Sequence, residues 1–271
     1  METLNRMLKK IEYITSVGFR CYATDLLKDY GLRKFSSPFD YIYIDLETCL
    51  ESIHTKFEKY LKDIVCIYKN ENHISKHYST NENIDDRLKD LMKESSIGYM
   101  PHVYNGNKLM INQNFLEKVS NNFYNWDRIL VFHHQNVLDE LVYETLKKRC
   151  DRLLKMYESY DKLALLHVTR IIEDDDLTKF KNNIKSMMEK YCIKCYLIVI
   201  ICSDKLIENH QMEGNILYII KKVPEYRRQV QTYPGTDNNL NYEREYKIMC
   251  KYFEFDLMEL QHFQDSFDTS M

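Results

Sequence analysis

Long apolar runs are missing from this chain of 271 residues, and their absence limits where the protein can reside. A membrane-spanning helix needs about 18 or more consecutive apolar residues, and no such stretch occurs. Residues 1 to 6 also lack the apolar core of a secretory signal peptide. We therefore expect a cytoplasmic protein that is neither secreted nor membrane-spanning.

A strong net charge is also absent, since the formal charge is −3 and the pI is near 6.3. Nucleic acids and anionic membranes attract proteins through basic surfaces, so we expect neither as a partner. Glycine and proline are scarce, with six and four residues. This scarcity, beside many Lys, Asn, Ile and Tyr, indicates translation from an AT-rich genome such as that of a large DNA virus. A viral protein of this kind would act in the host cytoplasm.

The eight cysteines follow no spacing typical of a disulfide framework; they stand at positions 21, 49, 66, 150, 192, 195, 202 and 250. In a reducing compartment they are expected to remain thiols. Cys192 and Cys195 form a lone C-x-x-C, and zinc would need two further ligands at a suitable spacing. His73, His77 and His102 stand in a polar stretch that promises no such set. We expect no disulfide, no metal and no cofactor.

Hydrophobic residues make up 44% of the chain and aromatic residues 13%, enough to fill a sizeable core. After residue 127, apolar segments typical of strands alternate with stretches of helical period. Strands are expected at 129–132, 163–168, 195–201 and 215–220, and helices at 138–157 and 176–190. Such alternation predicts parallel strands joined by right-handed crossovers. We therefore predict a single α/β domain over residues 1–271, with a largely parallel central sheet flanked by helices.

Three further segments complete the expected organisation. Residues 46–64 keep a helical period, and residues 242–263 are expected to form a closing helix. Residues 69–127 are polar and rich in Asn, His and Ser, with a helical piece at 85–92. We interpret this polar stretch as an insertion that packs on one face of the core.

The segment around Cys21 carries the strongest chemical signal. Gly18 indicates a turn, and the pattern from about Ala23 predicts that a helix opens just after the cysteine. Unpaired N–H groups and the positive end of the helix dipole stabilise a thiolate at such a position. Cys21 is therefore our candidate nucleophile. The alternative is a small apolar side chain under the first helical turn.

Two histidines follow the strand expected at residues 129–132. A cysteine nucleophile needs an imidazole within hydrogen-bond reach, to take up its proton and later to protonate the leaving group. His133 and His134 stand at the carboxyl end of that strand, where functional groups gather in parallel α/β sheets. Because side chains alternate along a strand, only one ring should face Cys21. We favour His133 and leave His134 open; the alternative is that one ring caps the next helix and the other is exposed.

Several short motifs near the start of the chain occur in an order that is typical of a known family. Ser-x-Gly-x-x-Cys, ending at Cys21, is followed by a helix, by Gly-Leu-Arg at 31–33 and by Pro-Phe-Asp at 38–40 before an aromatic residue. This order resembles the papain-like cysteine peptidase family found in bacteria and in large DNA viruses, over roughly residues 10 to 200. The resemblance implies a Cys-His site, and it makes a papain-like α+β fold the alternative to the α/β core.

Further site residues follow from the same resemblance. Asp40 ends the Pro-Phe-Asp motif, so it is the first candidate for orienting the imidazole, although it could simply cap the turn that follows. Asn136 and Asp139 are rivals for another reason, their proximity in sequence to the two histidines, and Asp139 also suits the N-terminus of the next helix. Arg149 and Arg152 lie three apart at about the place of a basic pair in the family. They could bind a carboxylate or phosphate, or pair with surface carboxylates.

Together these observations predict a cysteine hydrolase or peptidase that forms an acyl-enzyme. Cys21 would attack a carbonyl, with His133 or His134 as acid and base and Asp40 orienting the ring. Ser16 and the backbone N–H of Cys21 are candidates for an oxyanion site. The substrate would be a peptide or another acyl compound. Two alternatives stay open: a non-catalytic viral or host-interaction protein that keeps the fold for partner binding, and an α/β enzyme acting on a phosphorylated or sugar substrate through the arginine pair.

Overall fold

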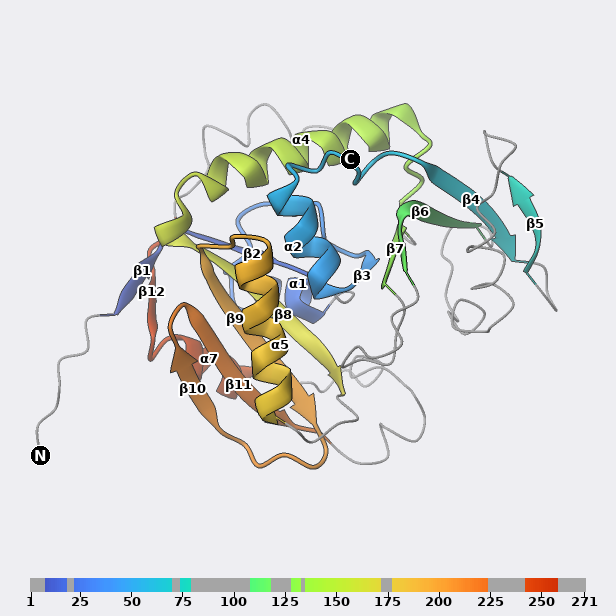
Figure 1. Cartoon of the computed structure of the whole chain (residues 1–271). Coiled ribbons are helices and arrows are strands. Elements are labelled where there is room, and N and C mark those ends of the chain that lie inside the picture. Colours follow the sequence, from blue (N-terminus) through green and yellow to red (C-terminus); the bar gives the residue numbers. More distant parts are fainter. Residues whose placement is uncertain are drawn as a thin grey trace, which may run out of the picture.

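Two five-stranded sheets and the helices around them form the framework of the computed structural model (Figure 1). The structure describes residues 8–18, 22–69, 74–78, 108–117, 128–132, 135–171, 177–223 and 242–257. Within these residues, one sheet is largely parallel and the other is antiparallel throughout. The result is a mixed α/β architecture.

The largely parallel sheet has the strand order β10-β11-β9-β8-β2. Its strands are β2 (Tyr13–Ser16), β8 (Leu163–Ile171), β9 (Tyr196–Ser203), β10 (His210–Glu213) and β11 (Ile216–Lys222). Only β10, at the edge, runs antiparallel to its neighbour. The strands expected at 163–168, 195–201 and 215–220 are therefore confirmed, and so is the parallel arrangement predicted from their alternation with helices.

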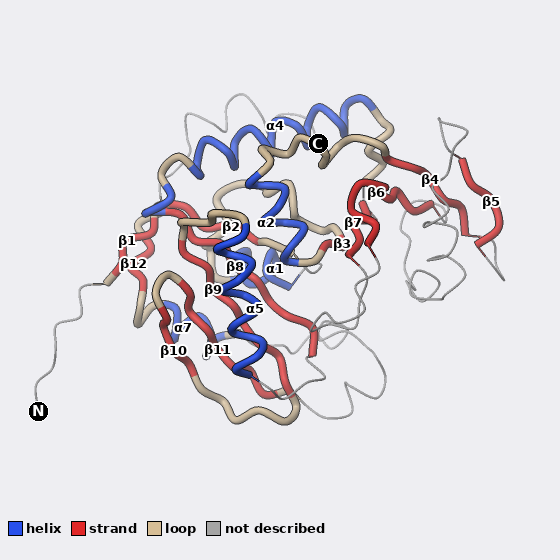
Figure 2. Tube along the Cα trace, in the orientation of Figure 1, coloured by secondary structure: helices blue, strands red, loops and turns tan. Residues whose placement is uncertain are grey.

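Helices cover both faces of this sheet (Figure 2). One face packs against α1 (Tyr22–Asp29) and α7 (Glu243–Met249), and the other against α2 (Leu46–His54), α4 (Glu140–Tyr157) and α5 (Leu177–Lys190). The residues of β9 after Tyr196 are all buried, as in a strand with apolar layers on both sides. The predicted helices at 138–157 and 176–190 match α4 and α5 closely.

The antiparallel sheet corrects part of the predicted organisation. It has the order β3-β7-β6-β4-β5, with β3 (Tyr43–Ile44), β4 (Ile64–Lys69), β5 (Ile74–Tyr78), β6 (Lys108–Glu117) and β7 (Arg128–Phe132). The described parts of the polar stretch 69–127 are thus strands, and the expected helix at 85–92 lies outside the described residues. The strand expected at 129–132 exists as β7, but it pairs with β3 and β6 and not with the parallel sheet.

A buried asparagine explains how a polar segment can form β6. Asn112 is fully buried, and its amide nitrogen donates to the carbonyl oxygens of Lys59 at 2.9 Å and Tyr60 at 2.8 Å. Its side-chain oxygen accepts from the N–H of Asn114 at 2.9 Å. A buried polar group is tolerated when its hydrogen bonds are satisfied in this way. Counting polar residues therefore underestimated the strand content of this region.

Two predicted helices are shorter in the structure. The helix expected at 46–64 ends with α2 at His54, because Lys56 and Phe57 adopt the left-handed conformation with φ of 53° and 60°. The helix expected at 242–263 ends at Met249, and the chain then forms β12 (Phe253–Phe255). This strand pairs in parallel with β1 (Lys9–Ile11), and the pairing buries Phe253. A short 3₁₀ helix, η1 (Tyr160–Lys162), precedes β8.

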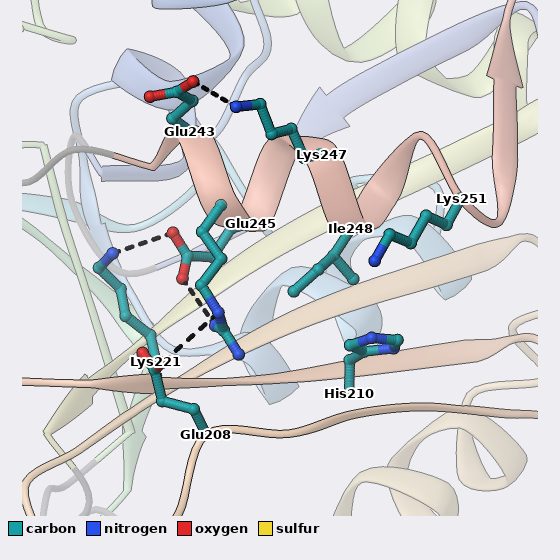
Figure 3. Close-up of a pocket in the computed structure, with 9 residues that line it drawn as sticks. Glu208, His210, Lys221, Glu243, Glu245, Lys247, Ile248 and Lys251 are labelled. Atoms are coloured by element: carbon teal, nitrogen blue, oxygen red, sulfur yellow. Dashed lines mark hydrogen bonds and ion pairs between the residues drawn. The ribbon is translucent and has the colours of Figure 1, made fainter.

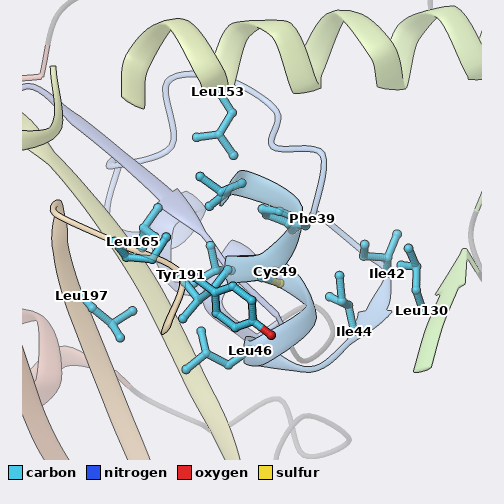
Figure 4. Close-up of a cluster of buried hydrophobic side chains, with 14 of the residues drawn as sticks. Phe39, Ile42, Ile44, Leu46, Cys49, Leu130, Leu153, Leu165, Tyr191 and Leu197 are labelled. Carbon is cyan, nitrogen blue, oxygen red and sulfur yellow. The ribbon is translucent and has the colours of Figure 1, made fainter. Parts of the chain in front are cut away.

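Residues of both sheets contribute to the same two apolar clusters. In the first cluster, Ile44 of β3 and Leu130 of β7 lie beside α2, and Leu165 of β8 and Leu197 of β9 lie on its other side (Figure 4). In the second, Ile111 and Val131 join the residues under α1. The two sheets are therefore packed through shared side chains. No helix in the described part of the chain is long and apolar enough to cross a membrane.

Candidate functional site

The structure describes the start of the turn expected before Cys21, at Gly18. Strand β2 ends at Ser16, and Gly18 takes a φ of 77°, a left-handed conformation that glycine adopts without steric cost. Helix α1 then begins at Tyr22, directly after Cys21 in the chain. Cys21 itself lies outside the described residues, as do His133 and His134. The residues on either side of the turn define the candidate site.

Asp40 joins the two sides of this turn. Its Oδ1 accepts hydrogen bonds from the hydroxyl of Ser16, at 2.6 Å, and from the hydroxyl of Thr24, at 2.8 Å. The two hydroxyls are themselves 3.1 Å apart. Ser16 closes β2 and Thr24 lies in the first turn of α1, and all three side chains are buried. One carboxylate oxygen thus fixes the strand before Cys21 to the helix after it.

The second oxygen of Asp40 is equally occupied. Arg33 approaches Oδ2 with Nη2 at 2.9 Å and Nε at 3.2 Å, a two-pronged ion pair. The backbone N–H of Ser37 donates to the same oxygen at 2.8 Å. Tyr41 follows with a φ of 56°, unusual for a residue other than glycine. Five donors therefore surround the carboxylate, and none of them is an imidazole of the described residues.

Ser16 and the two rivals of Asp40 differ in their hydrogen bonds. The Ser16 hydroxyl is buried and donates to Asp40, so its expected part in an oxyanion site stays a prediction. Asp139 accepts from the N–H groups of Leu141 and Val142 at 3.0 and 3.1 Å, which makes it the N-cap of α4. Asn136 differs from both, because its buried Oδ1 has no hydrogen-bond partner in the described part of the chain.

His167 is a site residue that the sequence reasoning did not single out. Its ring, on strand β8 next to β2, is 1% exposed, and Nδ1 lies 2.8 Å from the carbonyl oxygen of Val17. Because a carbonyl can only accept, Nδ1 carries the proton of the neutral ring. A Cβ added to Gly18 would stand 3.2 Å from this nitrogen and 3.3 Å from the carbonyl oxygen of Ile44. Gly18 therefore packs closely between the ring of His167 and strand β3.

Burial also sets the charge of His167. Removal of the ring from water lowers its pKa to about 4, although the hydrogen bond to Val17 acts in the opposite direction. The ring is therefore neutral near pH 7. A titratable residue inside the apolar run Leu-Ala-Leu-Leu-His-Val is the sequence signal that could have identified this position.

Strand β3 brings together the segments that lead to Cys21 and to the histidines. Ile44 of β3 lies against Gly18, three positions before Cys21. The same strand pairs with β7, with Ile44 opposite Leu130 and Tyr43 opposite Val131. Because the pair is antiparallel, β7 runs toward the Asp40 end of β3 as it approaches His133. Both segments therefore contact β3, Gly18 at Ile44 and β7 along Tyr43 and Ile44.

The expected basic pair stands on α4. Arg149 and Arg152 are both half-buried, and each interacts with another part of the protein. Between them, Cys150 is buried against the core. Their role in substrate binding stays a prediction.

The described cysteines are thiols, and the described residues form no metal site. Six cysteines have described side chains and all six are free thiols: Cys49, Cys150, Cys192, Cys195, Cys202 and Cys250. Burial raises the pKa of the Cys49 thiol well above its ordinary value and that of Cys195 to about 12. Among the residues that the structure describes, no three His, Cys, Asp or Glu side chains form a group that could hold a metal ion.

Comparison with known proteins identifies the family. The family described as "Putative papain-like cysteine peptidase (DUF1796)" matches residues 12–201, well over half of the chain. The chain belongs to this family. The match includes the Cys21 turn, Asp40, both candidate histidines and His167, and it supports the resemblance noted from the sequence. Neither a curated protein nor a solved structure matches the chain.

Proposed function

We propose that the protein is a cysteine hydrolase or peptidase in which Cys21 forms an acyl-enzyme. The observation that carries this proposal is the shared packing against β3. Gly18 of the Cys21 turn contacts Ile44, and β7 pairs with β3 and then runs toward its Asp40 end, where Asp40 bonds Ser16 and Thr24 on the two sides of Cys21. Membership of a family described as papain-like cysteine peptidases supports attack by a cysteine on an acyl group. The dense polar contacts around the turn support it too, because a nucleophile must be held within a fraction of an ångström of its working position.

In this proposal, the thiolate of Cys21 attacks a carbonyl carbon and forms a carbon–sulfur bond. His133 or His134, which holds the thiol proton as an imidazolium, passes it to the leaving group as the carbon–nitrogen or carbon–oxygen bond breaks. Water then gives a proton back to the imidazole and attacks the thioester. The acid product leaves, and the free thiol is restored. The substrate is a peptide or another acyl compound.

The residue that orients the imidazole must have an oxygen that can still accept a hydrogen bond. Asp40 is the expected candidate, but both of its oxygens already accept hydrogen bonds from Ser16, Thr24, Arg33 and Ser37. Asn136 has a buried side-chain oxygen without a partner in the described residues, two positions after His134. We therefore assign the orientation of the imidazole to Asn136, and to Asp40 the positioning of the turn that carries Cys21.

The test is the rate at which iodoacetamide alkylates each thiol of the full chain between pH 5 and pH 9, read by mass spectrometry. Cys21 should react fastest, with an apparent pKa below about 8.5, since a helix N-terminus and an imidazolium both favour the thiolate. Cys192 is exposed and serves as the internal reference for the alkylation rate of an accessible thiol. His133→Ala and His134→Ala then identify the partner, because only its loss should raise the pKa of Cys21.

Two outcomes would contradict the proposal. Cys21 alkylated no faster than Cys192 would remove it as the nucleophile and favour a binding protein that keeps the fold. If Cys21 is reactive but its pKa is the same in both histidine variants, Cys21 is still the nucleophile, but neither His133 nor His134 is its partner.

A further inference from the structure

A cleft outside the family-matched residues lies between the β10–β11 pair and α7 (Figure 3). Its volume is about 660 Å³, within the range of 300–1,000 Å³ typical of small-molecule sites. Of its nine lining residues, only Ile248 lacks an ionisable side chain. Four of the charged residues are Lys or Arg and three are Glu. The cleft is therefore polar, with a small excess of positive charge.

Each carboxylate that lines the cleft is already paired with a cation of the protein. Glu245 is completely buried and contacts Lys221 Nζ at 2.9 Å and Arg244 Nη1 at 3.2 Å. Glu208 lies 3.5 Å from Arg244 Nε, and Glu243 is paired with Lys247. The negative charges of the cleft are thus neutralised internally.

Three groups of the cleft that can donate hydrogen bonds are not paired with its carboxylates. Lys251 makes no ion pair with any described residue, and the Nη2 of Arg244 has no hydrogen-bond partner among them. His210 is bonded through Nδ1 to the hydroxyl of Tyr252 at 2.9 Å, which leaves Nε2 for another partner. Lys251 and His210 both project into the cleft below α7 (Figure 3). These three donors remain available to a ligand.

The electrostatics of His210 agree with this arrangement. Burial is the main cause of its lowered pKa, and the positive charges of Lys251 and Arg244 lower it further. The two cations are therefore close enough to the ring to act on it through space. A bound anion would offset both charges and would raise the pKa of His210.

We propose that this cleft binds a phosphate-bearing small molecule through Arg244, Lys251 and His210. The open Nη2 of Arg244, the ammonium of Lys251 and the Nε2 of His210 together match the several oxygens of a phosphate group better than the two of a carboxylate. A cleft of about 660 Å³ is also larger than a phosphate ion needs, so it has room for the body of a phosphorylated compound. This site is independent of Cys21 and of the acyl chemistry proposed above.

The experiment titrates the full chain with inorganic phosphate, with pyrophosphate and with acetate at constant ionic strength. Heat of binding is measured by calorimetry, and the ring of His210 is followed by NMR over a pH series. Pyrophosphate should bind with the highest affinity and should raise the pKa of His210. In Lys251→Gln the affinity should fall about tenfold, the loss of one charge-assisted hydrogen bond.

Lys62→Gln is the matched control, because it removes the same charge from an exposed lysine outside the cleft. It should leave the affinity unchanged. Equal weakening in the two variants would mean attraction by overall charge and would overturn the site. Acetate bound as tightly as phosphate would overturn the phosphate assignment, and no binding of any anion at millimolar concentration would overturn the proposal entirely.

Discussion

The carboxylate of Asp40 accepts a hydrogen bond from the hydroxyl of Ser16 at 2.6 Å. The same oxygen accepts from Thr24 at 2.8 Å, so residues on the two sides of Cys21 share one acceptor. Arg33 supplies the compensating charge at 2.9 Å from the other oxygen. The geometry of the turn therefore depends on a partly buried ion pair between Arg33 and Asp40, two residues that both follow the turn in the chain.

Asp40→Asn should destabilise the protein by about 3 kcal/mol, because Arg33 loses its counter-charge and a neutral amide accepts fewer of the five hydrogen bonds. Urea denaturation measures this loss. Asp45→Asn is the control: Asp45 caps α2 by accepting from the N–H of Thr48, and Asn can still do so. If Asp40 orients the imidazole instead, turnover should fall about 10⁴-fold while stability is nearly kept. Rate and stability of one variant separate the two roles.

Gly18→Ala should cost about 3 kcal/mol of unfolding free energy, measured by thermal and urea denaturation. The left-handed conformation alone costs about 1–2 kcal/mol in alanine, and the new methyl group would press on His167 and on the carbonyl of Ile44. Gly214→Ala is the matched control, since Gly214 has a φ of 61° with no atom within 4 Å of the added Cβ. Equal costs in the two variants would show that the His167 contact contributes nothing.

The neutral ring of His167 predicts a loss of stability in acid. In the unfolded chain it takes up a proton below about pH 6.5, but in the folded protein only near pH 4. Unfolding therefore binds a proton within this window, so stability present above pH 6.5 is lost as the pH falls to 4. The loss should be about 3 kcal/mol, from 1.36 kcal/mol per unit of pKa difference. Urea denaturation at several pH values measures it.

His167→Phe should remove this contribution, because the variant has no ring to protonate. Its stability should be lower at neutral pH, where the bond to Val17 is missing, but should fall less steeply below pH 6.5. His54→Gln, at an exposed position on α2, should keep the wild-type slope. The same slope in wild type and His167→Phe would contradict the buried neutral ring.

The buried pair of Lys221 and Glu245 predicts an asymmetric double-mutant cycle. Glu245→Leu leaves the ammonium of Lys221 without its counter-charge and should cost about 4 kcal/mol. Lys221→Met should cost less, about 2 kcal/mol, since Arg244 still contacts Glu245 at 3.2 Å. The double variant should lose less than the sum of the two. Additive losses, measured by urea denaturation, would argue against a direct interaction.

Local sequence patterns predicted the parallel half of the fold well. The segments that became β8, β9, α4 and α5 have an apolar period that matches a single kind of element, and burial on both sheet faces reinforces that choice. The turn at Gly18 and the helix after Cys21 were predictable for the same reason, because glycine and the apolar pattern act locally.

The antiparallel sheet could not be predicted from such patterns. Its stability depends on partners far along the chain, such as the loop carbonyls that satisfy Asn112 and the β3 strand that pairs with β7. The site shows the same limit. Cys21 and Asp40 stand in recognisable motifs, whereas Thr24 and His167 acquire their roles only when distant segments meet.

The bond between His167 and Val17 spans 150 positions of the chain, and β2 has β8 as its neighbour in the parallel sheet. A chain leaves the ribosome N-terminus first, so the residues that lead to Cys21 are synthesised long before the strand that holds them. Pairing across such a separation also forms slowly, because a long loop must close first. The contact of His167 with the segment before Cys21 thus forms late, and a chain interrupted before β8 would have the Asp40 contacts but not this one. Maturation of this site is therefore coupled to completion of the core.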